Sequence, residues 1–160
     1  MRPTRNDALF LAAAASLAIL LAGYWFQYVV GLAPCKLCLW QRWPHLIAPV
    51  LGMGALAVGG RMLPLAGAVT MAVSAGLGLY HTGVERKWWP GPSSCSGDVA
   101  GFRGMTPEQL LDPTQVSPVV LCDQVQWSLF GLSMASYNAL LSLALCAFWL
   151  WGYALSRTTH

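Results

Sequence analysis

Four long apolar runs, separated by polar segments, dominate the chain. The first run, residues 8–30, carries no charge over about 23 positions, enough for a helix to cross a hydrocarbon layer about 30 Å thick. Further runs occupy residues 43–60, 62–83 and 127–155, the second at the short end of the range for a membrane span. The pattern predicts an all-α membrane protein, a four-transmembrane-helix bundle, in a single domain covering residues 1–160.

The polar segments between the runs predict how the helices connect. Four spans place the connections at residues 31–42 and 84–126 on one face, opposite both termini. The longer loop is rich in proline and should be mostly irregular. Its residues 106–111 fit either a short interfacial helix with a capping box or a plain loop turn. For residues 8–30, a cleaved signal peptide is the alternative, but the run exceeds the usual apolar core of about 7–15 residues.

Composition agrees with a membrane protein. Hydrophobic residues make up 56% of the chain and charged residues 9%, whereas soluble domains carry about 25% charged residues. The third run is also rich in glycine and alanine, which favours close contact between helices. A net charge of +3 without a basic cluster argues against nucleic acid as a partner.

Four of the five cysteines lie in the two loops. Cys35 and Cys38 have the spacing of a redox dithiol. A zinc half-site would need two further close ligands, and a structural disulfide across so short a ring would stabilise little, so no metal site is expected. Cys95 and Cys122 could staple the long loop or exchange electrons with the first pair. Cys146 lies inside an apolar run and is most simply a small buried hydrophobe.

The cysteines also indicate the orientation. Lys and Arg residues divide almost evenly between the two faces, so the positive-inside rule does not decide. Paired cysteines in exposed loops persist in an oxidising compartment. We therefore expect the cysteine-bearing loops in the periplasm, and a multi-pass protein of the bacterial inner membrane with both termini cytoplasmic.

Three polar residues near the helix ends are further candidates. If a helix begins near Cys38, Arg42 lies on the same face, where a cation favours the thiolate; an arginine extending to lipid headgroups is the alternative. His45 and His81 are either hydrogen-bonded structural residues or a pair of haem ligands. A dithiol at the bilayer edge suits a lipid-soluble two-electron acceptor such as a quinone, whose protons could pass by His81.

Two motifs carry a resemblance to a known family. Residues 34–42, Pro-Cys-Lys-Leu-Cys-Leu-Trp-Gln-Arg, resemble the first-loop motif of the disulfide-bond-formation protein B (DsbB) family of inner-membrane, quinone-dependent thiol oxidases. Residues 122–134 resemble the family's stretch from the last loop cysteine into the fourth helix. Tyr80-His81 followed by Cys95 is similar to the exit of its third helix.

The resemblance implies a membrane thiol:quinone oxidoreductase that reoxidises a periplasmic thioredoxin-fold disulfide donor (DsbA-like) with ubiquinone or menaquinone. Cys95 and Cys122 would form the disulfide that the reduced partner attacks, with Cys95 taking the mixed disulfide. Cys122 would then exchange with Cys35, and Cys38 would face the quinone as a thiolate.

The resemblance also assigns supporting roles. Arg42 would support quinone binding, and His81 would lie near the quinone pocket. Gln41 departs from the family pattern, because some members carry an acidic residue there. Two alternatives stay open at this point: a quinone reductase of the vitamin K epoxide type, whose dithiol lies inside a helix, and a non-catalytic or haem-binding membrane scaffold with stapled loops.

Overall fold

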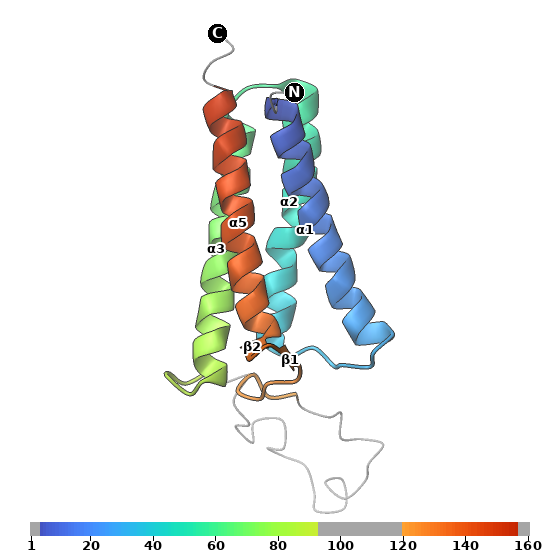
Figure 1. The fold of residues 1–160 in the computed structure, drawn as a ribbon, viewed down its shortest axis with the longest axis vertical. Coiled ribbons are helices and arrows are strands. Elements are labelled where there is room, and N and C mark those ends of the chain that lie inside the picture. The colour runs from blue at the N-terminus through green and yellow to red at the C-terminus, as the bar shows by residue number, and fades with distance from the viewer. Residues whose placement is uncertain (1–3, 93–119, 157–160) are drawn as a thin grey trace, which may run out of the picture.

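The computed structural model describes residues 4–92 and 120–156. In these residues the chain forms four long helices and one short hairpin (Figure 1). The elements are α1 (Arg5–Tyr28), α2 (Lys36–Val58), α3 (Met62–Glu85), β1 (Ser128–Leu129), β2 (Leu132–Ser133) and α5 (Met134–Leu155). Cys95 and the possible short helix at residues 106–111 lie outside the described residues.

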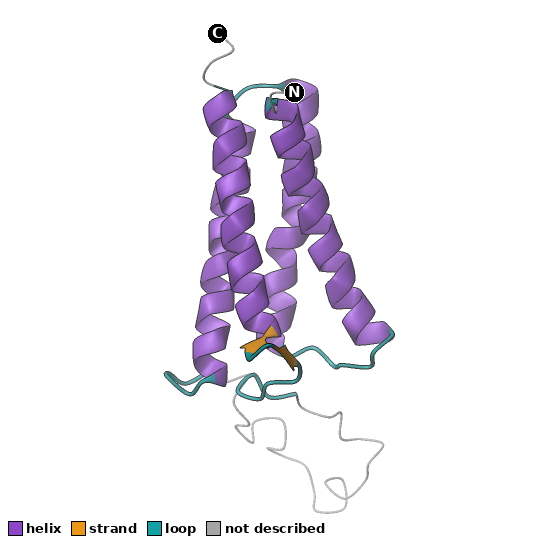
Figure 2. Ribbon diagram, viewed as in Figure 1, coloured by secondary structure: helices purple, strands orange, loops and turns teal. Residues whose placement is uncertain are grey.

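The helices run side by side along the long axis of the molecule. α1 begins and α5 ends at the end that also holds the turn between α2 and α3 (Figure 1). The connection from α1 to α2 and the β1–β2 hairpin lie together at the opposite end (Figure 2). The first connection and the hairpin leading into α5 therefore share one end, as the parity of four helices predicts.

Three of the described helices, α1, α3 and α5, are long and apolar enough to cross a membrane. Their outer faces expose large apolar side chains such as Phe10, Val69 and Leu140, which suits contact with lipid. α2 matches them in length, with 23 residues, but carries Lys36, Gln41 and Arg42 in its first two turns. The chain is thus a multi-pass membrane protein.

Two helices begin at residues that the apolar runs did not mark. α2 begins at Lys36, well before the predicted run at 43–60, because Cys35 acts as its N-cap. α5 begins at Met134, later than the predicted start near residue 127, because the preceding residues form the hairpin. Its turn has positive φ angles at Phe130 (50°) and Gly131 (76°), the geometry of a tight two-residue connection.

The bundle interior combines small residues with one large aromatic side chain. Trp149 on α5 is fully buried, and a Cβ atom on Gly67 of α3 would lie 2.4 Å from its ring. Further along the same interface, a Cβ atom on Gly78 would lie 2.8 Å from the backbone nitrogen of Ala139. The glycines of α3 therefore permit the close helix contact expected from composition. Cys146 packs against this core as a partly buried free thiol, consistent with a small hydrophobe.

Arg5 fastens the end of the bundle where α1 begins. Its Nε donates to Ser156 Oγ at 2.8 Å, and its Nη2 donates to the carbonyls of Ala55 and Gly60, each at 2.9 Å. One side chain of α1 thus holds the ends of α2 and α5. Together with the core packing, these contacts make α1 an integral part of the bundle.

Candidate redox site

The dithiol is built into the first turn of α2. Cys35 is the N-cap in an extended conformation, and its Sγ accepts a hydrogen bond from the Cys38 N–H at 3.2 Å. Both cysteines are free thiols, with their Sγ atoms 2.7 Å apart. Because the start of a helix presents unpaired N–H groups and a positive dipole end, this position favours a thiolate.

The two thiols differ in their pKa. Both lie before the apolar run at residues 43–60, which is the predicted membrane span. The hydrogen bond with the Cys38 side chain, and then burial, raise the pKa of Cys35. The same hydrogen bond lowers the pKa of Cys38, against an opposing effect of burial. The charge of Arg42 also lowers the pKa of Cys38, as expected from the sequence, but by less than the Cys35 contact. Cys38 is therefore the more acidic of the two thiols, because the same contact lowers its pKa and raises that of Cys35.

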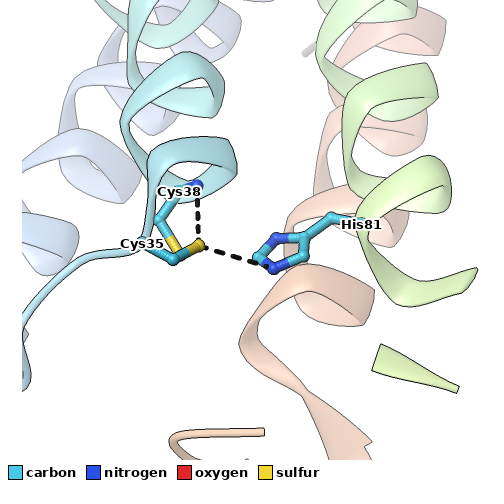
Figure 3. Close-up of side chains that lie close together, drawn as sticks. All are labelled: Cys35, Cys38 and His81. Carbon is cyan, nitrogen blue, oxygen red and sulfur yellow. Dashed lines mark hydrogen bonds between the residues drawn. The ribbon is translucent and has the colours of Figure 1, made fainter. Parts of the chain in front are cut away.

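His81 brings α3 against the dithiol (Figure 3). Its Nε2 lies 3.6 Å from Cys35 Sγ, and its Nδ1 lies 3.0 Å from Nε2 of Gln41. Glu85, one turn further along α3, places Oε1 4.0 Å from His81 Nε2 and accepts a hydrogen bond from the Ser133 hydroxyl. His81 thus links the dithiol to a buried carboxyl group at the loop end of the bundle.

Cys122 belongs to the buried cluster that holds Cys35. It is fully buried and disulfide-bonded, and with Cys35, Leu37 and Val84 it forms one buried cluster. A backbone hydrogen bond also joins Cys122 to His81. The described part of the chain therefore places one loop cysteine within reach of the helix dithiol, which the exchange interpretation requires.

A cavity of about 320 Å³ reaches the dithiol between α1, α2, α5 and the hairpin segment. Its wall is mostly apolar, with few polar side chains. Cys38 and His81 both line it, whereas Cys35 does not. The other lining residues include Leu20, Phe26, Gln41, Arg42, His45, Trp127, Asn138 and Leu141. The two sulfurs therefore have different surroundings: Cys35 belongs to the buried cluster with Cys122, whereas Cys38 packs against that cluster and also lines the cavity.

Arg42 stands on the cavity wall and is held by α1. Its Nη1 donates to Gln27 Oε1 at 2.6 Å, and its Nη2 donates to the Gly23 carbonyl at 3.2 Å. The guanidinium lies over the Tyr24 ring, 4.7 Å from the ring centroid. These contacts hold the charge of Arg42 inside the bundle, rather than among headgroups as in the alternative interpretation.

Two further buried polar groups lie at this site, and sequence reasoning missed the role of Gln41 while it anticipated His45 as a hydrogen-bonded structural residue. Gln41, noted in the sequence only as a departure from the family pattern, is buried and contacts His81. His45 is buried, with Nε2 2.9 Å from Asn138 Oδ1 and with Nδ1 lacking any partner. A helix beginning at Lys36 places Leu37, Gln41 and His45 on one face. The signal was therefore present, but recognising it required the correct helix start.

The histidines do not behave as one pair in the structure. Nε2 and Nδ1 of His81 contact Cys35 and Gln41, respectively. His45 instead belongs to a separate polar cluster with Ser74, Asn138 and Ser142. The two imidazoles therefore serve different parts of the bundle, and the haem interpretation gains no support from their contacts.

Taken together, a helical membrane bundle with a buried dithiol, an adjacent disulfide-bonded cysteine and a cavity at the dithiol defines a membrane disulfide oxidoreductase. Comparison with known proteins agrees with this class. The family model for disulfide bond formation protein DsbB matches residues 5–152, so the chain belongs to the DsbB family. This match confirms the resemblance carried by the two cysteine motifs.

Curated relatives give the same result. A "Disulfide bond formation protein B" of Albidiferax ferrireducens is 34% identical over 141 residues, covering 82% of this chain and 81% of the relative. Another, of Shewanella sp. (strain MR-4), is 32% identical over 139 residues, covering 84% and 78%. A protein of Rickettsia prowazekii, "Uncharacterized protein RP370", is 26% identical over 135 residues, covering 83% and 78%. No solved structure matches the chain significantly.

Family membership also bears on the vitamin K epoxide alternative. That alternative places the dithiol inside a helix, whereas the apolar run at residues 43–60 predicts that Cys35 and Cys38 precede one. This expectation was wrong in part, since Cys35 caps α2 but Cys38 lies within its first turn. The family match, rather than the position of the dithiol, therefore separates the two possibilities.

Proposed function

We propose that this protein reoxidises a periplasmic thioredoxin-fold disulfide donor (DsbA-like) and passes the electrons to a membrane quinone, ubiquinone or menaquinone. One observation carries the proposal: the dithiol lies against the buried cluster that holds disulfide-bonded Cys122, and Cys38 also lines the cavity. The proposal includes four spans in the bacterial inner membrane, with both termini cytoplasmic and the cysteine loops periplasmic.

In the first exchange, the partner's thiolate attacks a Cys95–Cys122 disulfide at Cys95. Cys122 leaves as a thiolate, and the partner's second thiol then displaces Cys95, so that the partner gains a disulfide and loses two electrons and two protons. Burial of Cys122 beside Cys35 supports its role as the cysteine that exchanges with the dithiol.

In the second exchange, the Cys122 thiolate attacks Cys35 of an oxidised Cys35–Cys38 pair. The S–S bond breaks and Cys38 leaves as a thiolate. Its lowered pKa makes it the better leaving group. Attack of Cys95 on the Cys122–Cys35 disulfide then restores the loop disulfide and leaves Cys35 as a thiol. The two electrons taken from the partner now reside on the helix dithiol.

The cavity fits a quinone as the acceptor. Its volume of about 320 Å³ lies within the range of small-molecule sites, and its wall is mostly apolar with a few polar groups. Arg42 holds a positive charge on that wall, and the buried Nδ1 of His45 is free to accept a hydrogen bond. A bound quinone would supply a two-electron, two-proton acceptor beside Cys38. His81, between Cys35 and Glu85, would hold the proton of the thiol.

The test is an anaerobic reaction of purified protein with a pre-reduced thioredoxin-fold dithiol and soluble ubiquinone and menaquinone analogues, followed by quinone absorbance. We expect loss of quinone that requires both the dithiol and Cys38, with Cys38→Ser as the matched control. Quinone loss that persists in Cys38→Ser would contradict the proposed route. Loop disulfides that resist exchange, together with no quinone loss, would favour the non-catalytic scaffold.

A further inference from the structure

The reactive end of the bundle also gathers three soft ligand atoms. Cys35 Sγ, Cys38 Sγ and His81 Nε2 all lie within 4.8 Å of one another (Figure 3). The sulfurs come from the start of α2 and the imidazole from the last turns of α3, so two rigid elements fix their relative positions. Sequence spacing gave only the two cysteines, and the fold adds the third ligand.

We propose that, when the dithiol is reduced, Cys35, Cys38 and His81 form a binding site for a thiophilic metal ion, with Zn²⁺ as the expected occupant. Two thiolates and one imidazole are a donor set that zinc prefers, and three protein ligands leave a fourth position open. This inference goes beyond the proposed function and does not depend on the identity of the electron acceptor.

The observed geometry lies close to what zinc requires. Tetrahedral coordination, with Zn–S near 2.3 Å and Zn–N near 2.0–2.1 Å, separates a sulfur from a nitrogen by about 3.5 Å and two sulfurs by about 3.8 Å. The distance from Cys35 Sγ to His81 Nε2 is 3.6 Å, which already fits. The Sγ–Sγ distance of 2.7 Å must widen, and a rotation of the Cys38 side chain about its Cα–Cβ bond moves that sulfur without moving the helix.

The surroundings of the three ligands also suit a metal. Ligating histidines usually donate their second ring N–H to an acceptor. The amide nitrogen of Gln41 lies 3.0 Å from His81 Nδ1, and a half-turn of that side-chain amide would bring its oxygen to the same position to accept the proton. A doubly charged ion with two thiolates sums to zero charge, which lowers the cost of burial at the membrane edge. Cys38 and His81 line the cavity, which gives the ion an entry path.

Metal binding would hold the protein in a reduced, inactive state. Both sulfurs would be occupied as ligands, so neither could attack a disulfide or rejoin the other. The site would exist only in the reduced protein, because a Cys35–Cys38 disulfide has no thiolate to offer. Metal affinity and redox state are therefore linked: each ion bound withdraws one reduced dithiol from turnover.

The experiment uses Co²⁺ as a spectroscopic probe, followed by displacement with Zn²⁺. The full-length protein is prepared in detergent with Cys95, Cys122 and Cys146 replaced by serine, so that the helix dithiol supplies the only thiols. Wild-type protein is titrated in parallel in its reduced and oxidised forms. His81→Gln is compared with the matched variant His45→Gln, which alters a buried histidine outside the ligand cluster.

We expect one equivalent of Co²⁺ to give thiolate-to-cobalt charge-transfer and tetrahedral d–d bands in the reduced protein and none in the oxidised protein. His81→Gln should weaken binding at least tenfold, and His45→Gln less than threefold. Equal affinity in the two histidine variants would overturn the assignment of His81. Reduced wild-type protein without these bands would overturn the site as a whole, whether or not quinone turnover is observed.

Discussion

Replacing Gly78 by alanine tests how closely α3 and α5 approach beside the redox site. A Cβ atom at position 78 would lie 2.8 Å from the backbone nitrogen of Ala139 and 3.0 Å from its Cα. Because ordinary carbon contacts lie at about 3.5–4.0 Å, the two helices must separate. Backbone atoms cannot rotate away as a flexible side chain can, so the strain falls on the helix pair itself.

The size of the effect follows from two opposing contributions. Forcing an extra methyl group into a packed interface costs about 1–3 kcal/mol. Alanine also stabilises a helix relative to glycine by about 0.5–1 kcal/mol. Gly76 separates the two contributions, because it lies on the same helix with nothing within 4 Å of its Cβ position. Gly76→Ala should show the helix contribution alone, and the difference between the variants should equal the packing cost.

The free energy of unfolding can be measured in mixed micelles by titration with SDS, with helix content followed by circular dichroism. We expect Gly76→Ala to match or slightly exceed the wild type in stability, and Gly78→Ala to lie about 1–3 kcal/mol below Gly76→Ala. A difference smaller than about 0.5 kcal/mol would refute the close approach inferred here. Size-exclusion chromatography before titration confirms that both variants start from the same monodisperse state.

Three further predictions concern the dithiol and its neighbours. With Cys95, Cys122 and Cys146 replaced by serine, the Cys38 thiolate should be alkylated at a lower pH than an ordinary thiol, because the contact with Cys35 lowers its pKa. Cys35→Ala should shift the pH profile of alkylation to higher pH, and an unchanged profile would contradict this cause. Arg42→Met should raise the KM for quinone at least tenfold while helix content is unchanged, because the substitution removes the charge on the cavity wall. An unchanged KM would show that Arg42 takes no part in quinone binding. Cys35→Ser and Cys95→Ser should each abolish quinone reduction by the reduced partner, although membrane fractionation shows normal insertion; residual turnover in either would argue against the two-step exchange.

Hydrophobic patterning predicted the number and order of the helices in the described residues, because apolar runs of membrane length have few alternative structures. It misplaced the start of α2, since Lys36, Gln41 and Arg42 lower the apolar average over the first two turns. The cap by Cys35 is a local feature that averaging conceals. The hairpin before α5 was missed for a related reason, because Phe130 interrupts no apolar run although it adopts a positive φ angle.

In the candidate site, too, some features could be predicted from the sequence and others depend on the fold. The spacing of Cys35 and Cys38 and the motif around Cys122 predicted a redox dithiol and the family, because residues that are close in sequence can be recognised without the fold. The partner of His81 could not be predicted, because its contact with Cys35 spans 46 positions and depends on how α3 packs against α2. The role of Gln41 depends on the same packing. Contacts between residues that are distant in sequence can be identified only once the packing of the helices is known.

The different surroundings of the two sulfurs affect which molecules can reach each of them. Cys35 is enclosed in the cluster that holds the loop cysteine, whereas Cys38 also lines the apolar cavity, so only one of the two sulfurs borders that space. With only 3% of its surface exposed, Cys35 offers little access to a thiol from solution. In the proposed route, this burial limits direct reaction of the cell's soluble thiols with the sulfur that receives electrons from the loop pair.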